Sequence, residues 1–259
     1  MVGIDDALLA RLKPGPRVKG ALRGLVDVLM PPATFDDGAR ALAPGLSDRA
    51  WSRVTFLEDP VCDGCGLAFE HEAGSLGQDR CPACMARPHI FARARAACVY
   101  DEHSRDLILA FKHTDRLELA PLFTRWLTRA AAPLLDETDA VVPVPLHWSR
   151  LINRRANQAA EIARPLARAT GRAYLPDALI RVRPTPSQGG KSARGRAQNV
   201  KKAFAVPEHQ ARDVRGRRVL LVDDVLTTGA TADSCARVLL EAGARSVGLA
   251  VIARVRSRR

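Results

Sequence analysis

Two adjacent carboxylates, Asp223 and Asp224, stand just ahead of a short hydroxyl-rich stretch, and this spacing suits a bound sugar phosphate. The stretch consists of Thr227, Thr228, Gly229, Ala230 and Thr231. Carboxylates accept hydrogen bonds from a vicinal diol such as that of ribose. A turn of small residues at the start of a helix exposes backbone N–H groups and the positive end of the helix dipole, which suit a phosphate. We therefore predict a sugar-phosphate site at residues 223–231.

This site needs a strand before it and a helix after it, and the sequence has the patterns of both. Val219–Val222 is a continuous apolar run, typical of a parallel strand that is buried on both faces. The two carboxylates would then lie at the carboxyl end of that strand, where open α/β sheets bind ligands. A helical pattern begins near Ala232. A buried strand followed by a solvated acidic turn is the simpler alternative, but the order of all the parts favours a site.

Four cysteines form a second group with chemical potential. They are two C-x2-C pairs separated by fifteen residues, namely Cys62, Cys65, Cys81 and Cys84. This spacing is typical of a ribbon in which two knuckles bind one Zn²⁺, and the alternative is a metal-free thiol cluster. Four thiolates leave no open coordination position, so we expect a structural zinc within a ribbon at about residues 58–90. Cys98 and Cys235 lie in apolar segments and are expected in the core.

Composition limits the classes of function. The chain has 259 residues, 47% of them hydrophobic, and a net charge of +12 that arises from arginine, because only six of the forty basic residues are lysine. Such a charge attracts nucleic acid or phosphorylated small molecules, but it is spread along the chain and only 5% of residues are aromatic. No apolar run approaches the ~20 residues that span a bilayer, and the N-terminus lacks a signal-peptide pattern. We expect a cytoplasmic protein without membrane insertion.

Strand and helix patterns alternate along the rest of the chain. Strands are expected at 96–100, 139–144, 178–182, 218–222 and 246–253, and helices at 104–113, 120–132, 157–170 and 232–242. This order predicts an α/β fold with a mostly parallel sheet and helices on both of its faces. The chain is expected to divide into residues 1–95, with an apolar helix at 25–32 and the ribbon, and a sheet domain at 96–259.

The motifs together resemble a known family. Residues 219–231 resemble the loop that binds phosphoribosyl pyrophosphate (PRPP) in type I phosphoribosyltransferases. Ahead of that loop stand the cysteine knuckles and then, in order, Val142–Leu146, Arg155, Asn157, Gln158, Arg181, Arg183, Thr185, Gln188, Arg196, Asn199 and Val200. This combination is similar to the ComF family of competence-protein-like phosphoribosyltransferase homologues, which usually carry a zinc ribbon in front.

The resemblance implies roles for particular residues. Asp223 and Asp224 would hold the ribose hydroxyls, and Thr227–Thr231 would cradle the 5-phosphate of PRPP, with Mg²⁺ bridging pyrophosphate and ribose. Residues that bind the pyrophosphate are expected on two basic segments. One follows the strand at 139–144 and supplies the cations Arg150, Arg154 and Arg155, and the other is a loop that could close as a lid, with the cations Lys191, Arg194 and Arg196 and the neutral Asn199; Arg196 and Asn199 match a family motif. A solvated helix face and an ordinary flexible loop are the respective alternatives for these two segments.

The chain also departs from the family pattern. Members commonly carry a further ribbon, and its cysteine positions correspond here to Thr34, Asp37, Ser47 and Ala50, so we expect one zinc rather than two. Ala156 stands where the family usually has an aromatic residue. Thr227 takes the position of the acidic catalyst of purine-salvage relatives, which argues against hypoxanthine or guanine as the acceptor.

Two functions follow as hypotheses. In the first, the protein binds PRPP or a related ribose 5-phosphate ligand with Mg²⁺ and transfers the phosphoribosyl group to an acceptor that the sequence does not identify. In the second, it is a non-catalytic accessory of DNA uptake that contacts single-stranded DNA or a partner protein of the competence machinery.

Overall fold

The computed structural model describes residues 33–41, 45–69, 79–113, 116–146, 156–182 and 203–256. The chain forms two compact units, Met1–Trp51 and Ser52–Arg259. The cysteine ribbon belongs to the larger unit together with the sheet. The expected boundary between residues 95 and 96 stays a prediction, and the apolar stretch at 25–32 lies outside the described residues.

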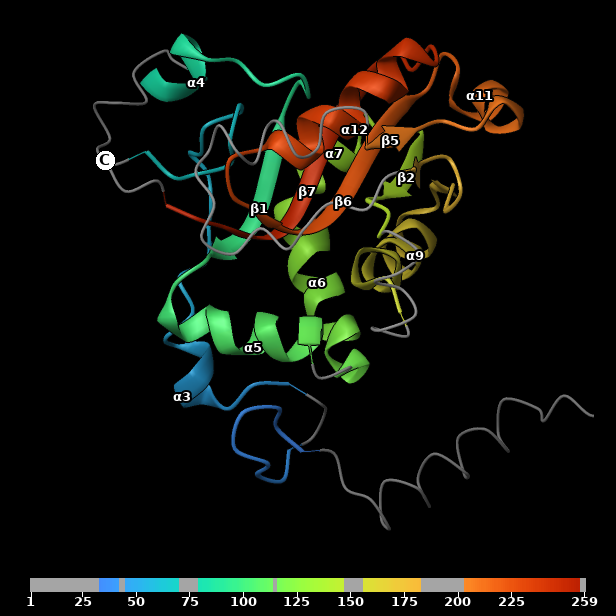
Figure 1. Ribbon diagram of the computed structural model, residues 1–259. Coiled ribbons are helices and arrows are strands. Elements are labelled where there is room, and N and C mark those ends of the chain that lie inside the picture. The colour runs from blue at the N-terminus through green and yellow to red at the C-terminus, as the bar shows by residue number, and fades with distance from the viewer. Residues whose placement is uncertain are drawn as a thin grey trace, which may run out of the picture. The chain divides into compact units, whose positions relative to one another are not determined.

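A five-stranded sheet forms the centre of the larger unit (Figure 1). Its strands are, in spatial order, β1 (Ala94–Val99), β7 (Ser246–Arg254), β6 (Arg218–Leu226), β2 (Ala140–Pro143) and β3 (Ala173–Tyr174). All neighbouring pairs run parallel. The predicted parallel sheet is therefore confirmed, and β6, which leads into the hydroxyl-rich loop, lies inside it with a partner on each side.

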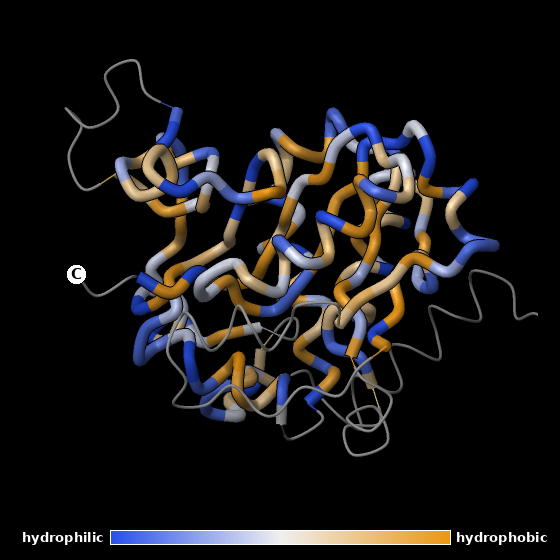
Figure 2. Tube along the Cα trace, turned by 45° about the horizontal axis from the view of Figure 1, so that its top comes forward, coloured by the Kyte–Doolittle hydropathy of each residue, from blue (hydrophilic) through white to orange (hydrophobic). Residues whose placement is uncertain are grey.

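Helices cover both faces of this sheet, as expected for strands that are apolar throughout. Val219 and Leu221 of β6 pack in one core cluster with Cys235 and Leu239 of α12 (Ala230–Glu241). That cluster contains no residue of α6 (Ala120–Ala130) or α9 (Gln158–Thr170), which contact each other and the sheet. Because strand residues alternate between faces, these two helices lie on the face opposite α12. Hydrophobic residues accordingly concentrate along the strands (Figure 2).

Several smaller elements complete the described part of the chain. They are α3 (Asp48–Trp51), α4 (Pro82–Ala86), α5 (Glu102–His113), η2 (Leu117–Leu119), α7 (Ala132–Leu135), β4 (Ile180–Arg181), β5 (Phe204–Ala205) and α11 (Glu208–Val214). No helix in the described ranges is both long and apolar enough to cross a membrane.

The structure corrects the expected elements in three places. The strand predicted at 178–182 is the short β4, which pairs antiparallel with β5 in a separate two-stranded sheet. The helix predicted at 120–132 is two helices, α6 and α7, because Pro133 has no N–H to continue the first helix and stands in the first turn of the second. The sequence analysis did not predict β3, β5 or α11, whose short sequences have no clear periodicity.

Candidate functional site

The loop between β6 and α12 brings the predicted ligand-binding residues to one place. Strand β6 continues to Leu226, so Asp223 and Asp224 lie among the last residues of the strand rather than beyond its end. Gly229 has a φ of +80°, a conformation that glycine adopts readily, and α12 begins at the next residue. Residues 223–231 all line one cavity of about 470 Å³. The N–H groups of α12 ahead of Asp233, whose own N–H donates to the carbonyl of Gly229, have no partners within the helix.

The two carboxylates differ in their surroundings. Lys112 of α5 places its Nζ 2.7 Å from Oδ2 of Asp224, and the backbone N–H of Asp224 donates to Oδ1 of Asp223 at 2.9 Å. Burial and the negative charge of Asp224 raise the pKa of Asp223 to about 7, against the opposing effects of that N–H, Lys112 and Arg181. Asp223 therefore changes its charge near neutral pH, at the position where a diol or a cation would bind.

Polar groups from β4 and from the start of α9 also line this cavity. Arg181 of β4 lies with its Cζ 5.3 Å from the centre of the Phe204 ring and contributes positive charge toward Asp223. Asn157 caps α9 by accepting from the backbone N–H of Ala159, and its Nδ2 donates to the carbonyl of Val144. Gln158 is 2% exposed, and its Nε2 has no hydrogen-bond partner among the described residues. A buried amide of this kind is a donor that a ligand would satisfy.

Asn157, Gln158 and Arg181 match family motifs in the sequence, but no role in ligand binding was predicted for them. The sequence analysis missed Lys112, and no local pattern marks that residue, which is one polar position on a helix far from the loop in sequence. The residues expected to bind pyrophosphate lie outside the described residues, and their role stays a prediction; they are Arg150, Arg154, Arg155, Lys191, Arg194, Arg196 and Asn199.

The four cysteines converge as the spacing predicts. The sulfur atoms of Cys62, Cys65, Cys81 and Cys84 all lie within 4.8 Å of one another. A tetrahedral Zn²⁺ with Zn–S bonds of about 2.3 Å requires sulfur atoms roughly 3.8 Å apart, and the measured separation of the Cys65 and Cys81 sulfurs is 3.9 Å. Gly64 permits this approach, since a Cβ there would lie 2.8 Å from the Cβ of Cys84. The thiols thus fit one zinc ion.

The electrostatics of the cluster also suit a metal. A hydrogen bond from the Cys65 thiol lowers the pKa of Cys62 to about 4, although burial opposes this effect. Burial and the charge of Cys62 raise the pKa of Cys84 to about 12. Without a metal, the cluster therefore holds one readily formed thiolate beside thiols that resist ionisation. A divalent cation would relieve this conflict by stabilising every thiolate.

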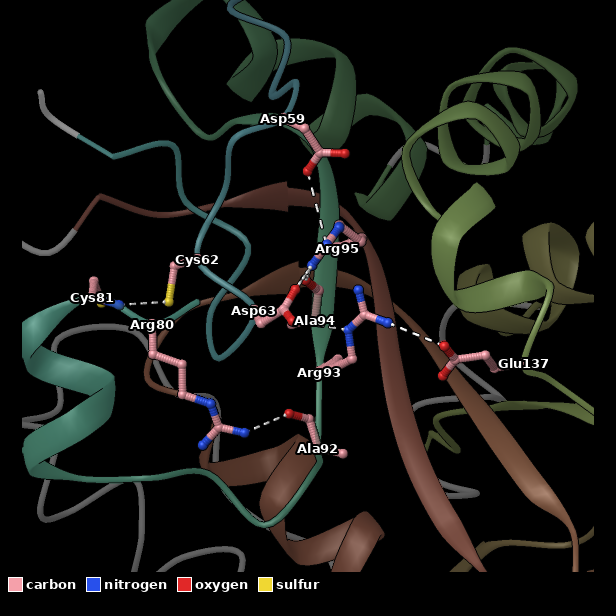
Figure 3. A network of polar contacts seen from close by, with 10 residues as sticks. All are labelled: Asp59, Cys62, Asp63, Arg80, Cys81, Ala92, Arg93, Ala94, Arg95 and Glu137. Atoms are coloured by element: carbon pink, nitrogen blue, oxygen red, sulfur yellow. Dashed lines mark hydrogen bonds and ion pairs between the residues drawn. The ribbon is translucent and has the colours of Figure 1, made fainter. Parts of the chain in front are cut away.

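Polar contacts fasten the ribbon to the edge strand β1 (Figure 3). Asp63, between the first two cysteines, pairs with Arg95 at 2.7 Å and with Arg93 at 3.1 Å, and its carbonyl accepts from the N–H of Ala94. Arg80, ahead of the second pair, donates to the carbonyl of Ala92 at 3.0 Å. Arg95 is 7% exposed, so its pairing with Asp63 is well shielded from water. The ribbon is therefore an integral part of the larger unit.

The positions that correspond to the further ribbon of other family members fold here without cysteine. In the smaller unit, Thr34 donates to Asp37, and Ser47 donates through its hydroxyl to Asp36 at 2.5 Å and through its N–H at 2.8 Å. The hydroxyl of Ser47 also accepts from the N–H of Ala50. Hydrogen bonds thus connect the two turns that a metal would otherwise join. Within the described ranges, Cys62, Cys65, Cys81 and Cys84 are the cluster that could hold a metal ion.

Comparison with known proteins agrees with this architecture. The phosphoribosyl transferase domain family matches residues 127–259. The chain is 32% identical to the DNA utilization protein YhgH of Escherichia coli K12 over 201 residues, which are 76% of this chain and 85% of that protein. It is 30% identical to competence protein F of Haemophilus influenzae over 200 residues, 75% of this chain and 85% of that protein.

A solved structure gives a looser match. Glutamine PRPP amidotransferase of B. subtilis, complexed with ADP and GMP, covers 49% of this chain and 24% of its own, at 27% identity and a TM-score of 0.34. A superposition of this quality carries no argument about the site.

The sheet, the family match and the loop between β6 and α12 define a protein with a phosphoribosyl transferase domain. Its relatives indicate a particular family within this class, because they are competence and DNA utilization proteins that align with this chain over most of their length. The chain belongs to the ComF family. The family resemblance of its sequence motifs is confirmed.

Proposed function

We propose that the cavity at residues 223–231 binds PRPP, or a related ribose 5-phosphate ligand, together with Mg²⁺, and that the protein transfers the phosphoribosyl group to an acceptor. One observation carries this proposal: a carboxylate pair and a helix-starting loop of small residues line the same cavity of about 470 Å³. A ribose 5-phosphate needs acceptors for its diol at one end and N–H donors for its phosphate at the other.

The surrounding cations support a ligand with more charge than one phosphate. Lys112 and Arg181 both line the cavity at its carboxylate end, where Lys112 pairs with Asp224 and the charge of Arg181 acts on Asp223. Positive charge at this end suits a pyrophosphate on C1 of the ribose. Asp223 and Asp224 are oxygen ligands of the kind that Mg²⁺ binds, alongside the pyrophosphate. When bound, Mg²⁺ would neutralise charge on the departing pyrophosphate.

Calorimetry with PRPP and Mg²⁺ tests the proposal, with the chain compared with its double variant Asp223→Asn and Asp224→Asn. Loss of charged hydrogen bonds to the diol, about 1.5–3 kcal/mol each, predicts a fall in affinity of at least tenfold. Asp139→Asn is the matched control, because Asp139 pairs with Arg218 at the opposite end of the strands. Unchanged PRPP binding by the double variant, or no binding by the unsubstituted chain, would contradict the proposal. Pyrophosphate release in a screen of acceptor bases then tests transfer.

The names of the relatives favour a second candidate, an accessory role in handling single-stranded DNA or a competence partner. The net charge of +12 is compatible with binding to phosphate backbones. Steeply salt-dependent binding of single-stranded DNA, retained by the Asp223→Asn, Asp224→Asn variant, would support this role. Full-length protein is required, because the ribbon contacts β1 and cannot be removed cleanly. Absence of DNA binding at low salt would exclude direct contact.

A further inference from the structure

Two residues connect the cysteine ribbon to residues 226–233, here called the phosphate loop. Neither belongs to the cysteine cluster or lines the cavity of about 470 Å³. Arg254, at the end of β7, reaches the beginning of the loop. His89, just after the second cysteine pair, reaches its end. Both contacts act on residues 226–233.

Arg254 joins a cysteine knuckle directly to the loop. Its side chain is shielded, since the residue is 7% exposed. The Nε atom donates to the carbonyl of Cys65 at 3.2 Å, while Nη1 donates to the carbonyls of Leu226 and Thr227 at 3.2 and 2.7 Å. A guanidinium group is planar and rigid, so it fixes the carbonyl of one element relative to those of the other. Displacement of Cys65 is therefore transmitted to the first residues of the loop.

His89 braces the other end. Its Nδ1 lies 3.0 Å from Oδ2 of Asp233 in the first turn of α12, and the neighbouring N–H of Ile90 donates to the other oxygen of Asp233 at 2.8 Å. The imidazole stacks on Phe91 and lies against Gly229, where an added Cβ would stand 2.4 Å from Cε1. Its side chain is 14% exposed. The segment leaving the ribbon thus covers the glycine and holds the start of the helix.

We propose that Arg254 and His89 are positioning residues that couple the cysteine cluster to the phosphate loop, so that zinc binding and sugar-phosphate binding strengthen each other. Zinc joins the two knuckles, which fixes the Cys65 carbonyl and the segment that carries His89. Both supports then hold residues 226–233 in the binding conformation. Thermodynamic linkage makes the effect reciprocal, because a ligand that favours the supported loop must also favour the metal-bound ribbon. The identity of the ligand rests on the proposed function, whereas the coupling of the ribbon to the loop does not.

Hydrogen exchange tests the coupling without any ligand. Zinc-loaded and chelated protein are compared in peptides that cover residues 226–233, with peptides of β2 as the internal reference. We expect chelation to increase exchange in the loop while β2 stays protected. In zinc-loaded protein, His89→Ala should increase exchange in the same peptides, with zinc content unchanged. If chelation unfolds the whole sheet, the His89→Ala comparison decides the matter, and unchanged loop exchange in that variant overturns the proposal.

Affinity measurements test the linkage itself, with ribose 5-phosphate as the probe. Coupling of this kind is typically 5–150-fold, and we expect zinc loading to tighten ribose 5-phosphate binding by about tenfold. Arg254→Lys, which keeps the charge but not the planar fork, should reduce that factor to below about threefold. Arg80→Lys is the matched control, because Arg80 also joins the ribbon to a carbonyl, that of Ala92, away from the loop. A coupling factor near one in the unsubstituted chain, or equal loss in both variants, overturns the proposal.

The two experiments separate this inference from the proposed function. If zinc-loaded protein binds neither ribose 5-phosphate nor PRPP, the proposed function fails, while loop exchange still responds to zinc. If the ligand binds with full affinity and loop exchange ignores both zinc and His89→Ala, the coupling fails and the proposed function stands.

Discussion

Replacement of Gly229 by alanine is the most demanding test of the loop geometry. The residue has a φ of +80°, and a left-handed conformation destabilises a non-glycine residue by about 1–2 kcal/mol. The new methyl group would also stand 2.4 Å from Cε1 and 2.7 Å from Nδ1 of His89. The imidazole must therefore move and release Asp233, and a hydrogen bond to a carboxylate contributes about 1.5–3 kcal/mol. We expect Gly229→Ala to lower the free energy of unfolding by roughly 2.5–5 kcal/mol.

Gly171 supplies a matched control for this substitution. It has a φ of +66° at the end of α9, but an added Cβ there meets nothing within 4 Å. Gly171→Ala should therefore show only the backbone effect of about 1–2 kcal/mol. The measurement is urea denaturation of zinc-loaded protein at fixed metal concentration, with the slope checked for equality among variants.

A double-mutant cycle isolates the contact with His89. Removal of the imidazole by His89→Ala leaves room for the methyl group, so Gly229→Ala should then destabilise the protein only about as much as Gly171→Ala does. If Gly229→Ala lowers the free energy of unfolding no more than Gly171→Ala does in the original background, the packing of the ribbon segment against the loop is refuted. It is also refuted if Gly229→Ala is as destabilising in the His89→Ala background as in the original one.

Three further predictions concern charge and metal. The pKa of Asp223 is raised to about 7 from its ordinary value of 3.8, so between these pH values the folded state binds a proton that the unfolded state has lost, and the free energy of unfolding should fall as pH rises through that window. Asp223→Asn should therefore stabilise the protein at pH 8 and do so less near pH 5. A stability difference between variant and original chain that does not change with pH would contradict the raised pKa. Lys112→Met removes the cation 2.7 Å from Asp224, so it should raise the pH midpoint of that stability difference and weaken PRPP binding more than ribose 5-phosphate binding, and equal effects on the two ligands would argue against a pyrophosphate near Lys112. Metal analysis should find one zinc per chain, lost on Cys62→Ser with Cys81→Ser, whereas two zinc ions or none would refute the single-ribbon assignment.

Features that depend on local pattern were predictable from the sequence. The apolar run at 219–222, the carboxylates and the small-residue turn are neighbours in the chain, and their order alone predicts strand, site and helix. The cysteine spacing likewise encodes a tetrahedral cluster, because each C-x2-C pair closes its own turn. The short β4 shows the limit: an apolar segment predicts a strand, but nothing local indicates that its partner is β5 rather than the main sheet.

The residues that support the site were not predictable in the same way, because each acts across a long stretch of chain. Lys112 meets Asp224 from a helix more than a hundred positions earlier, and a lysine on an amphipathic helix ordinarily signals only a solvated face. Arg254 is the first residue after the strand expected at 246–253, and a terminal arginine carries no sign that it will be buried between two backbone turns.

Contacts between residues far apart in the sequence also join the ribbon to the rest of the larger unit. Contacts of Cys65 with Arg254, and of His89 with Asp233, join segments separated by well over a hundred residues. Ordering such distant segments loses chain entropy, which must be offset by the contacts that they form. A zinc ion that fixes the knuckles beforehand reduces what the loop must order on binding its ligand. In the proposed coupling, a metal site more than a hundred residues away in sequence would thereby help to prepare residues 226–233 for a phosphate.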